Sequence, residues 1–135
     1  MRISIVESGG DLSKIFQEKV AKKIETATFE TKKALDLFDV LAYSRRMINS
    51  DQLVIIAMLN SEELELNKVF FQGLAMFEGE TGKNIFKCFY NEDENGEAKV
   101  SDLADTFVEY LFPSSKPSPK KSKEDNYFGP PSFPF

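Results

Sequence analysis

The stretch QLVIIAMLN, residues 52–60, decides the fold class of this protein. Its apolar run from Leu53 to Leu59 is typical of a strand that is buried on both faces, as the strands of parallel sheets are. Open parallel sheets bind ligands beyond the carboxyl ends of their strands, so the loop after Leu59 is the first candidate site. That loop offers Asn60, Ser61 and three glutamates, with no glycine, basic residue or histidine among them.

Apolar segments and amphipathic segments alternate along the chain up to residue 112. We expect strands over residues 2–7, 26–31, 53–59 and 84–90, and helices over residues 12–24, 34–47, 61–79 (or to 82) and 100–112. Strands that alternate with helices form parallel sheets with helices on both faces. The pattern predicts an α/β protein, a three-layer α/β/α fold with a four-stranded parallel sheet whose first and third strands are central.

The ends and inner faces of the helices also follow from local patterns. Asp11 is the candidate N-cap of the first helix, because its carboxylate can accept hydrogen bonds from free N–H groups. Asn60 or Ser61 has the same expected role in the third helix, which Gly79 or Gly82 is expected to end. From the helical period, the inner faces are expected to include Leu35, Phe38 and Leu41 in the second helix and Val69, Phe70, Leu74 and Phe77 in the third.

A change of composition marks the end of the domain. All six prolines lie between Pro113 and Pro134, so we expect a domain over residues 1–112 and a tail over residues 113–135. No apolar run reaches the roughly 20 residues that span a bilayer, and the first residues do not form a signal peptide. The single cysteine, Cys88, permits no internal disulfide. These features predict a cytoplasmic protein that does not contact a membrane.

The chain contains no histidine, the commonest general base and metal ligand near neutral pH. Catalysis by Ser-His-Asp or Cys-His groups is therefore excluded, and neither a zinc site nor a cofactor is expected. The interpretation leans toward a protein without catalytic activity. The chain carries a net charge of −5 and the tail +2, which leaves −7 on the domain, so no direct nucleic-acid binding is expected.

Three patterns have both a structural and a chemical interpretation. The glycine pair at residues 9–10 allows a tight turn or faces a ligand at a helix N-terminus, and the turn is favoured because Asp11 would repel a phosphate. Acidic runs at residues 62–65 and 92–94 suit Mg²⁺ or proton transfer, but solvated loop charge is favoured. Cys88 lies within a strand and is expected to be a small core residue rather than a nucleophile.

The tail combines lysine and proline with four aromatic residues, Tyr127, Phe128, Phe133 and Phe135. Aromatic side chains beyond a proline-rich spacer are typical of peptides that dock into apolar grooves, so we expect them to bind a protein partner. The Pro-Phe pair at residues 134–135 resembles the ending of bacterial single-stranded-DNA-binding protein tails, which recruit partners. An adaptor that docks on a DNA-processing protein is therefore one alternative function.

The stretches RISIVES, LFDVLAYSRRMINSDQLVIIAML, KCFYNEDENGEAK and DLADTFVEYLF are similar to the lumazine synthase superfamily, and most closely to its archaeal-type riboflavin synthase branch. The resemblance covers residues 1–112. It implies a lumazine-synthase or flavodoxin-like fold, homo-oligomers that are commonly pentamers, and a flavin or pteridine ligand between subunits. Independently of the resemblance, Phe71 and Tyr43 lie outside the main helical stripes and are expected to serve self-association.

The resemblance also implies ligand-binding residues in the loops after the first three strands. Carried over by position, these are Ser8 and Gly9 at the ring system, Thr31 and Lys32 at the ribityl chain, and Asn60 and Ser61 in the third loop. That loop lacks the Gly-Ala-Thr phosphate cradle and the histidine of lumazine synthases, so lumazine formation is not expected. The leading prediction is a divergent, non-catalytic binding or assembly protein, and a riboflavin synthase-like enzyme is the other alternative.

Overall fold

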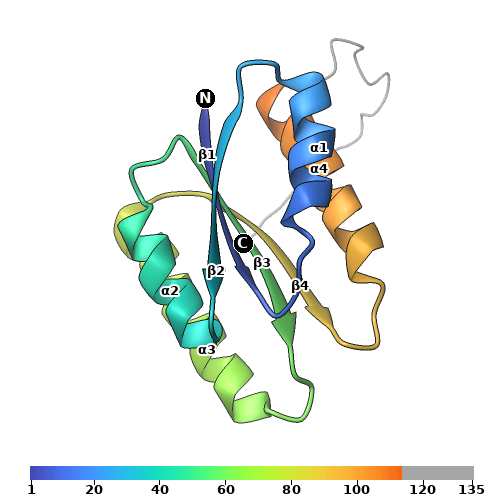
Figure 1. The fold of residues 1–135 in the computed structure, drawn as a ribbon. Helices are drawn as coiled ribbons and strands as arrows, with labels where there is room; N and C mark the ends of the chain where they lie inside the picture. Colours follow the sequence, from blue (N-terminus) through green and yellow to red (C-terminus); the bar gives the residue numbers. More distant parts are fainter. Residues whose placement is uncertain (114–135) are drawn as a thin grey trace, which may run out of the picture.

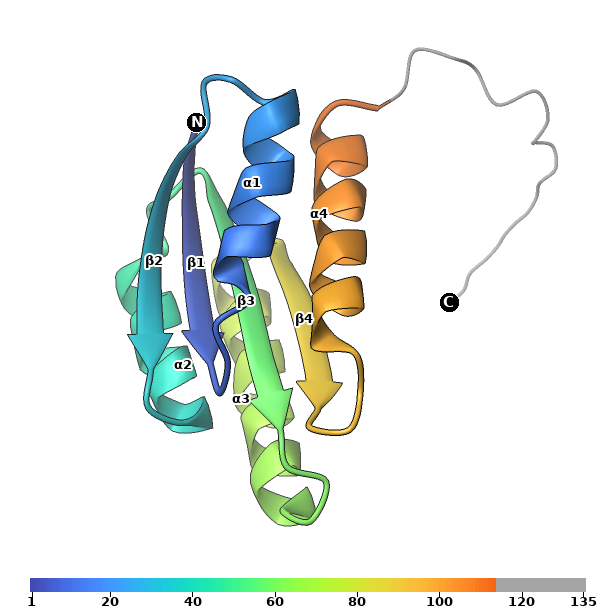
Figure 2. The same ribbon diagram turned by 45° about the vertical axis from the view of Figure 1, so that its right-hand side comes forward.

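Four parallel strands form the central sheet in the computed structural model, which describes residues 1–113 (Figure 1). The strands are β1 (Arg2–Ser8), β2 (Thr28–Ala34), β3 (Gln52–Leu59) and β4 (Ile85–Asn91). Their order is β2-β1-β3-β4, which Figure 2 shows from one edge of the sheet to the other. The predicted fold class is confirmed, with β1 and β3 in the centre.

Helices cover both faces of this sheet. The helices α1 (Ser13–Lys23) and α4 (Gly96–Leu111) pack together on one face, and α2 (Leu37–Arg46) and α3 (Leu64–Thr81) lie on the other (Figures 1 and 2). Two apolar clusters separate the layers, because alternate residues of β3 enter different clusters. Val54 and Ile56 join the α1/α4 cluster, whereas Leu53 and Ile55 join the α2/α3 cluster. This burial on both faces explains the unbroken apolar run.

The second strand differs from its expected position. Residues 26–31 were the expected strand, but β2 runs from Thr28 to Ala34. Its register against β1, from Arg2 opposite Thr28 to Ser8 opposite Ala34, determines these bounds. The pairing extends β2 through Lys32 and Lys33, although lysine is poorly suited to strands, because the hydrogen bonds of a neighbouring strand outweigh local propensity.

The inner faces of two helices were partly wrong in the sequence prediction. Leu35 and Phe38 are 93% and 51% exposed, whereas Leu37 and Val40 are buried on α2. The cause is Asp36, whose carboxylate accepts a hydrogen bond from the Asp39 N–H (2.8 Å) and starts the helix after Leu35. On α3, Phe70, Leu74 and Phe77 are buried as predicted, but Val69 is 48% exposed.

The ends of the first and third helices also show which caps form. Neither Asp11 nor Ser61 caps its helix; the N-cap residues are Leu12 in α1 and Glu63 in α3, and neither forms a cap hydrogen bond with its own side chain. The Asn60 amide oxygen instead accepts a hydrogen bond from the Glu62 N–H (2.9 Å) in the loop before α3. Gly82 ends α3 in the left-handed conformation (φ 68°), which confirms one of the two predicted ends.

Gly9 and Gly79 provide a matched pair of glycine-to-alanine tests. Gly9 has φ +87°, and a Cβ there would lie 2.7 Å from the Met58 Cβ. We therefore expect Gly9→Ala to lower the free energy of unfolding by about 1–3 kcal/mol. A Cβ on Gly79, within α3, meets nothing within 4 Å, so Gly79→Ala should raise it by about 0.5–1 kcal/mol. Urea unfolding of both variants checks the two signs, and a neutral Gly9→Ala would contradict the turn geometry.

Candidate functional site

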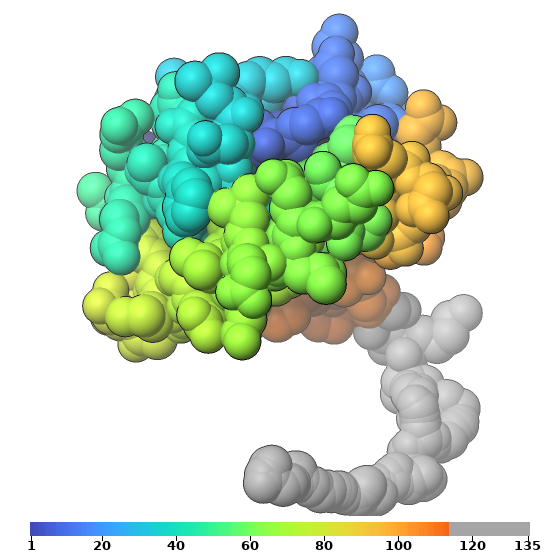
Figure 3. Space-filling view, turned by 90° about the horizontal axis from the view of Figure 1, so that it is seen from below, coloured from blue at the N-terminus to red at the C-terminus, as the bar shows by residue number. Residues whose placement is uncertain are grey.

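The loops that leave the carboxyl ends of the strands gather at one end of the sheet, which Figure 3 shows from below. After β1 the chain continues to β2 at one edge of the sheet, and after β3 it continues to β4 at the other edge. The connections that leave β1 and β3 therefore run in opposite directions from the centre of the sheet. This is the position where open parallel sheets bind ligands. Ser8 lies opposite Ala57 here, and Gly9 packs against Met58.

Four of the six ligand-binding residues that the resemblance implied lie at this carboxyl end of the sheet. Ser8 is buried, Gly9 is exposed beside the end of β3, and Asn60 and Ser61 are exposed immediately after β3. The two others lie elsewhere, because β2 extends three residues further than expected. Thr31 lies within β2, where its hydroxyl accepts a hydrogen bond from the Gln17 amide (2.8 Å). Lys32 is also within β2 and forms an ion pair with Glu30 (3.9 Å). The loop after β2 begins instead at Leu35.

Beneath the turn after β1 lies a fully buried carboxylate, Glu7. Its Oε2 accepts hydrogen bonds from the backbone N–H groups of Leu12 and Ser13, the latter at 3.1 Å. Its Oε1 forms an ion pair with the Lys33 ammonium at 3.4 Å. Glu7 therefore takes the role that the sequence assigned to Asp11, because a negative charge at this position satisfies free N–H groups at the start of α1.

Lys33 connects this buried carboxylate to the surface. Its ammonium donates hydrogen bonds to the Asp11 carboxylate (2.9 Å) and to the Gly10 carbonyl (3.0 Å). The hydrogen bond from Lys33 holds the pKa of Asp11 below its ordinary value, and the same bond raises the pKa of Lys33. Lys33 of β2 thus pairs with both carboxylates beside the β1–α1 turn, which indicates a structural role for this cluster.

Tyr90, near the end of β4, packs against the same β1–α1 turn. The residue is 4% exposed, and its hydroxyl has no hydrogen-bond partner among the described residues. Burial raises the pKa of this hydroxyl. A Cβ on Gly10 would lie 2.4 Å from the Tyr90 hydroxyl oxygen, so Gly10 is required for this close approach. Gly9, with φ +87°, thus forms the turn, and Gly10 leaves room for the Tyr90 hydroxyl.

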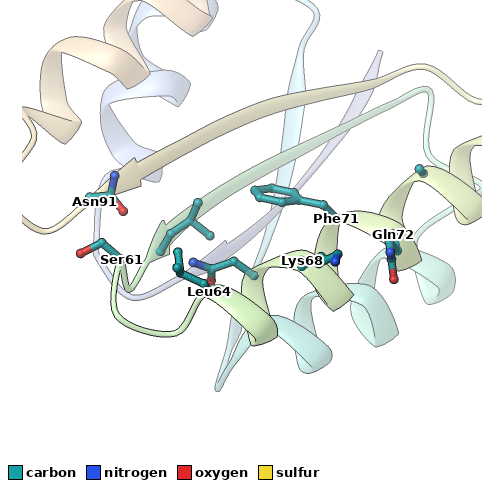
Figure 4. A pocket seen from close by; sticks show the side chains of 9 residues that line it. Ser61, Leu64, Lys68, Phe71, Gln72 and Asn91 are labelled. Carbon is teal, nitrogen blue, oxygen red and sulfur yellow. The ribbon is translucent and has the colours of Figure 1, made fainter.

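An open apolar groove of about 610 Å³ lies beside α3, where β3 and β4 end (Figure 4). Leu59 and Asn91, the last residues of β3 and β4, are opposite each other in the sheet register. Ser61 and Asn91 lie at one end of the groove, and Phe71 and Gln72 lie further along α3. The full lining consists of Leu59, Ser61, Leu64, Asn67, Lys68, Phe71, Gln72, Ala75 and Asn91.

Aromatic packing and one buried amide shape the groove. The Phe71 ring is held by a tilted contact with Phe70 (5.6 Å between centroids) and an edge contact with Phe89 (5.3 Å), yet 40% of the residue stays exposed. The Asn67 amide nitrogen donates to the Asn60 carbonyl (2.9 Å), which attaches the start of α3 to the loop after β3. Phe71 thus presents a fixed apolar surface with polar groups around it, the usual character of a binding groove.

Most of the groove was not predicted from the sequence, although Ser61 and Phe71 were named. The missed residues form a side stripe of α3 that starts at Leu64 and continues through Lys68 and Ala75. With Phe71 between Lys68 and Ala75, the spacings along this stripe are four, three and four residues, which is helical, so the stripe itself was detectable. The sequence did not show that this stripe stays uncovered, because that depends on where β4 and α2 lie.

In the part of the chain that the structure describes, the acidic runs form no metal site and Cys88 is buried. Among residues 1–113, no three His, Cys, Asp or Glu side chains are grouped so that they could hold a metal ion. Glu94 instead accepts hydrogen bonds from the Asn91 N–H (2.7 Å) and from Lys99 (3.0 Å), which lower its pKa. Cys88 is 6% exposed, and burial raises the pKa of its thiol, as expected for a core residue.

The fold and the groove define a three-layer α/β/α protein with an apolar groove at the carboxyl end of a parallel sheet. No protein-family model matches the chain, and no curated protein matches it. The family resemblance therefore stays a prediction. None of the helices within residues 1–113 has both the length and the apolar character needed to cross a membrane. The predicted docking residues Tyr127, Phe128, Phe133 and Phe135 lie outside the described residues.

Proposed function

We propose that this chain is a non-catalytic, self-associating assembly protein of the lumazine synthase-like type, and that α3 supplies its main contact. One observation supports this proposal most directly, the large apolar side chains that α3 exposes. Leu64, Val69, Phe71 and Met76 are 71%, 48%, 40% and 64% exposed. Leu64 and Phe71 lie together in the groove, and an exposed apolar patch of this kind on a monomer marks an interaction site.

The chemistry of the chain is consistent with binding rather than catalysis. The sequence contains no histidine, and its one thiol is buried with a raised pKa. The buried carboxylate Glu7 is engaged by the start of α1 and by Lys33. Around the groove, the polar groups are amides, one hydroxyl and Lys68, which can orient a bound surface but do not form a general acid–base pair.

Sedimentation velocity at micromolar concentration tests self-association. The wild-type chain should sediment as an assembly with a mass well above the 15.3 kDa of one chain. Phe71→Glu should lower the mass of this assembly, because a charge replaces an apolar contact. Tyr110→Glu is the matched control, since Tyr110 is 59% exposed on α4, on the opposite face of the sheet. A wild-type protein that remains a monomer would contradict the proposed function.

The groove supports one other function, the binding of a flavin or pteridine in a riboflavin synthase-like site. Its volume of about 610 Å³ lies within the range of small-molecule sites, and the Phe71 ring offers a stacking surface. Titration of the protein with riboflavin, monitored by quenching of flavin fluorescence, tests this function. Saturable quenching that Phe71→Ser weakens at least tenfold would support it, and quenching that Phe71→Ser leaves unchanged would place the ligand elsewhere.

A further inference from the structure

Two exposed apolar surfaces lie at opposite edges of the sheet. One is the groove described above, beside α3 at the end of β4. The other is formed by Leu35 and Phe38, 93% and 51% exposed, where β2 gives way to α2; we call it the corner. Because β2 and β4 are the two edge strands, about three inter-strand spacings, or roughly 14 Å, separate the two surfaces.

Helix packing explains why the groove faces away from the corner. A Cβ on Gly73 would lie 2.9 Å from the Leu41 side chain, so this side of α3 packs against α2. Phe71 precedes Gly73 by two residues, about 200° around the helix, and therefore lies on the other side of α3. There its ring meets Phe89 of β4 at 5.3 Å. One copy of the chain thus cannot bring its own corner to its own groove.

One charged group in the groove wall, Lys68, complements the charges of the corner, while Glu62, Glu63 and Glu65 add negative charge at the start of α3. At the corner, the Asp39 carboxylate accepts a hydrogen bond from the Leu35 N–H (2.8 Å), and the Asp36 carboxylate accepts one from the Asp39 N–H (2.8 Å). Two negative charges therefore accompany the apolar pair. At the groove, Lys68 lines the wall, and none of the ion pairs found within residues 1–113 includes it. An acidic apolar projection would meet an apolar groove that carries an unpaired positive charge.

We propose that the corner of one copy, Leu35 with Phe38, inserts into the α3 groove of a second copy, with Asp36 and Asp39 next to Lys68. The inference rests on the proposed self-association and specifies its geometry. Since different surfaces meet, the contact is heterologous, and each copy retains a free corner and a free groove. Such contacts propagate into a closed ring or an open filament rather than stop at a symmetric dimer.

Mixing two complementary variants tests this geometry. Leu35→Ser/Phe38→Ser removes the corner but keeps the groove, and Leu64→Glu, at a side chain that is 71% exposed, disables the groove but keeps the corner. Each variant alone should be a monomer at concentrations where the wild-type chain assembles, with association weakened at least tenfold. The equimolar mixture should form a dimer of about twice the 15.3 kDa chain mass, because one intact corner meets one intact groove.

Three results would overturn the inference. A corner variant that keeps the wild-type mass would show that α3 surfaces meet each other symmetrically, and a mixture that stays monomeric would show that the corner and the groove are not partners. In both cases the proposed self-association stands if the wild-type chain assembles. A monomeric wild-type chain would overturn both proposals. Thermal unfolding of each variant distinguishes lost association from lost folding.

The charge pairing has its own readout. Lys68→Glu should weaken assembly at least tenfold at low salt, and the difference from the wild-type chain should shrink as the salt concentration rises. Lys22→Glu, at the exposed end of α1 on the opposite face, is the matched control and should leave the mass unchanged. Equal effects of the two substitutions would indicate a general charge effect and would contradict the pairing.

Discussion

Replacing Phe107 by alanine is expected to lower the free energy of unfolding by about 3–5 kcal/mol, the usual cost of removing a fully buried phenylalanine. Phe107 is completely buried on α4. Its ring makes edge contacts with Phe16 of α1 (5.1 Å between centroids) and with Phe86 of β4 (4.8 Å). The substitution therefore opens a cavity where two helices and the sheet meet, and neither neighbouring ring can fill it without moving.

Phe38→Ala is the matched control, measured in the same urea unfolding experiment at a protein concentration at which the chain is a monomer. Sequence periodicity placed Phe38 on the inner face of its helix, but the side chain is half exposed, so its loss should cost less than about 1 kcal/mol of folding free energy. Comparable losses for the two variants would contradict the rotation of α2 that the structure shows. A loss below about 1 kcal/mol for Phe107→Ala would contradict the packing of α1 against α4.

The second large effect is expected for Glu7→Ala, which should lower the free energy of unfolding by about 2–4 kcal/mol. The substitution removes the acceptor for the N–H groups of Leu12 and Ser13, and the Ser13 residue is only 3% exposed. A buried N–H group without a partner retains its full desolvation cost. The ion pair with Lys33 adds less, because the Lys33 side chain is 55% exposed and water screens it.

Two further variants separate the parts of this effect. Glu7→Gln retains an acceptor oxygen but not the charge, so about half of the stability should return. Asp11→Ala removes the carboxylate that the sequence favoured as the cap, and it should leave the free energy of unfolding nearly unchanged because Asp11 is exposed. If Asp11→Ala destabilised the protein more than Glu7→Ala, the assignment of the cap to Glu7 would be wrong.

The sequence determined those features that depend on residues close together in the chain. The apolar run from Leu53 to Leu59 requires burial on both faces, and burial on both faces requires a helical layer on each side of a parallel sheet. The alternation of apolar segments with amphipathic ones then specified the order of the elements. Gly82 could be predicted as a helix end because left-handed backbone favours glycine in any context.

Tertiary structure alone decided the features that depend on segments distant in the chain. The bounds of β2 follow from its register with β1, so Lys32 lies within the strand rather than in the loop, and Thr31 lies inside the strand rather than at its end. The cap of α1 is Glu7, five residues before Leu12, because the tight turn brings the end of β1 back to the start of the helix. The groove exists because β4 and α2 leave one side of α3 uncovered. Helical periodicity identifies the stripes of a helix, but only the packing of the neighbouring elements decides which stripe they bury.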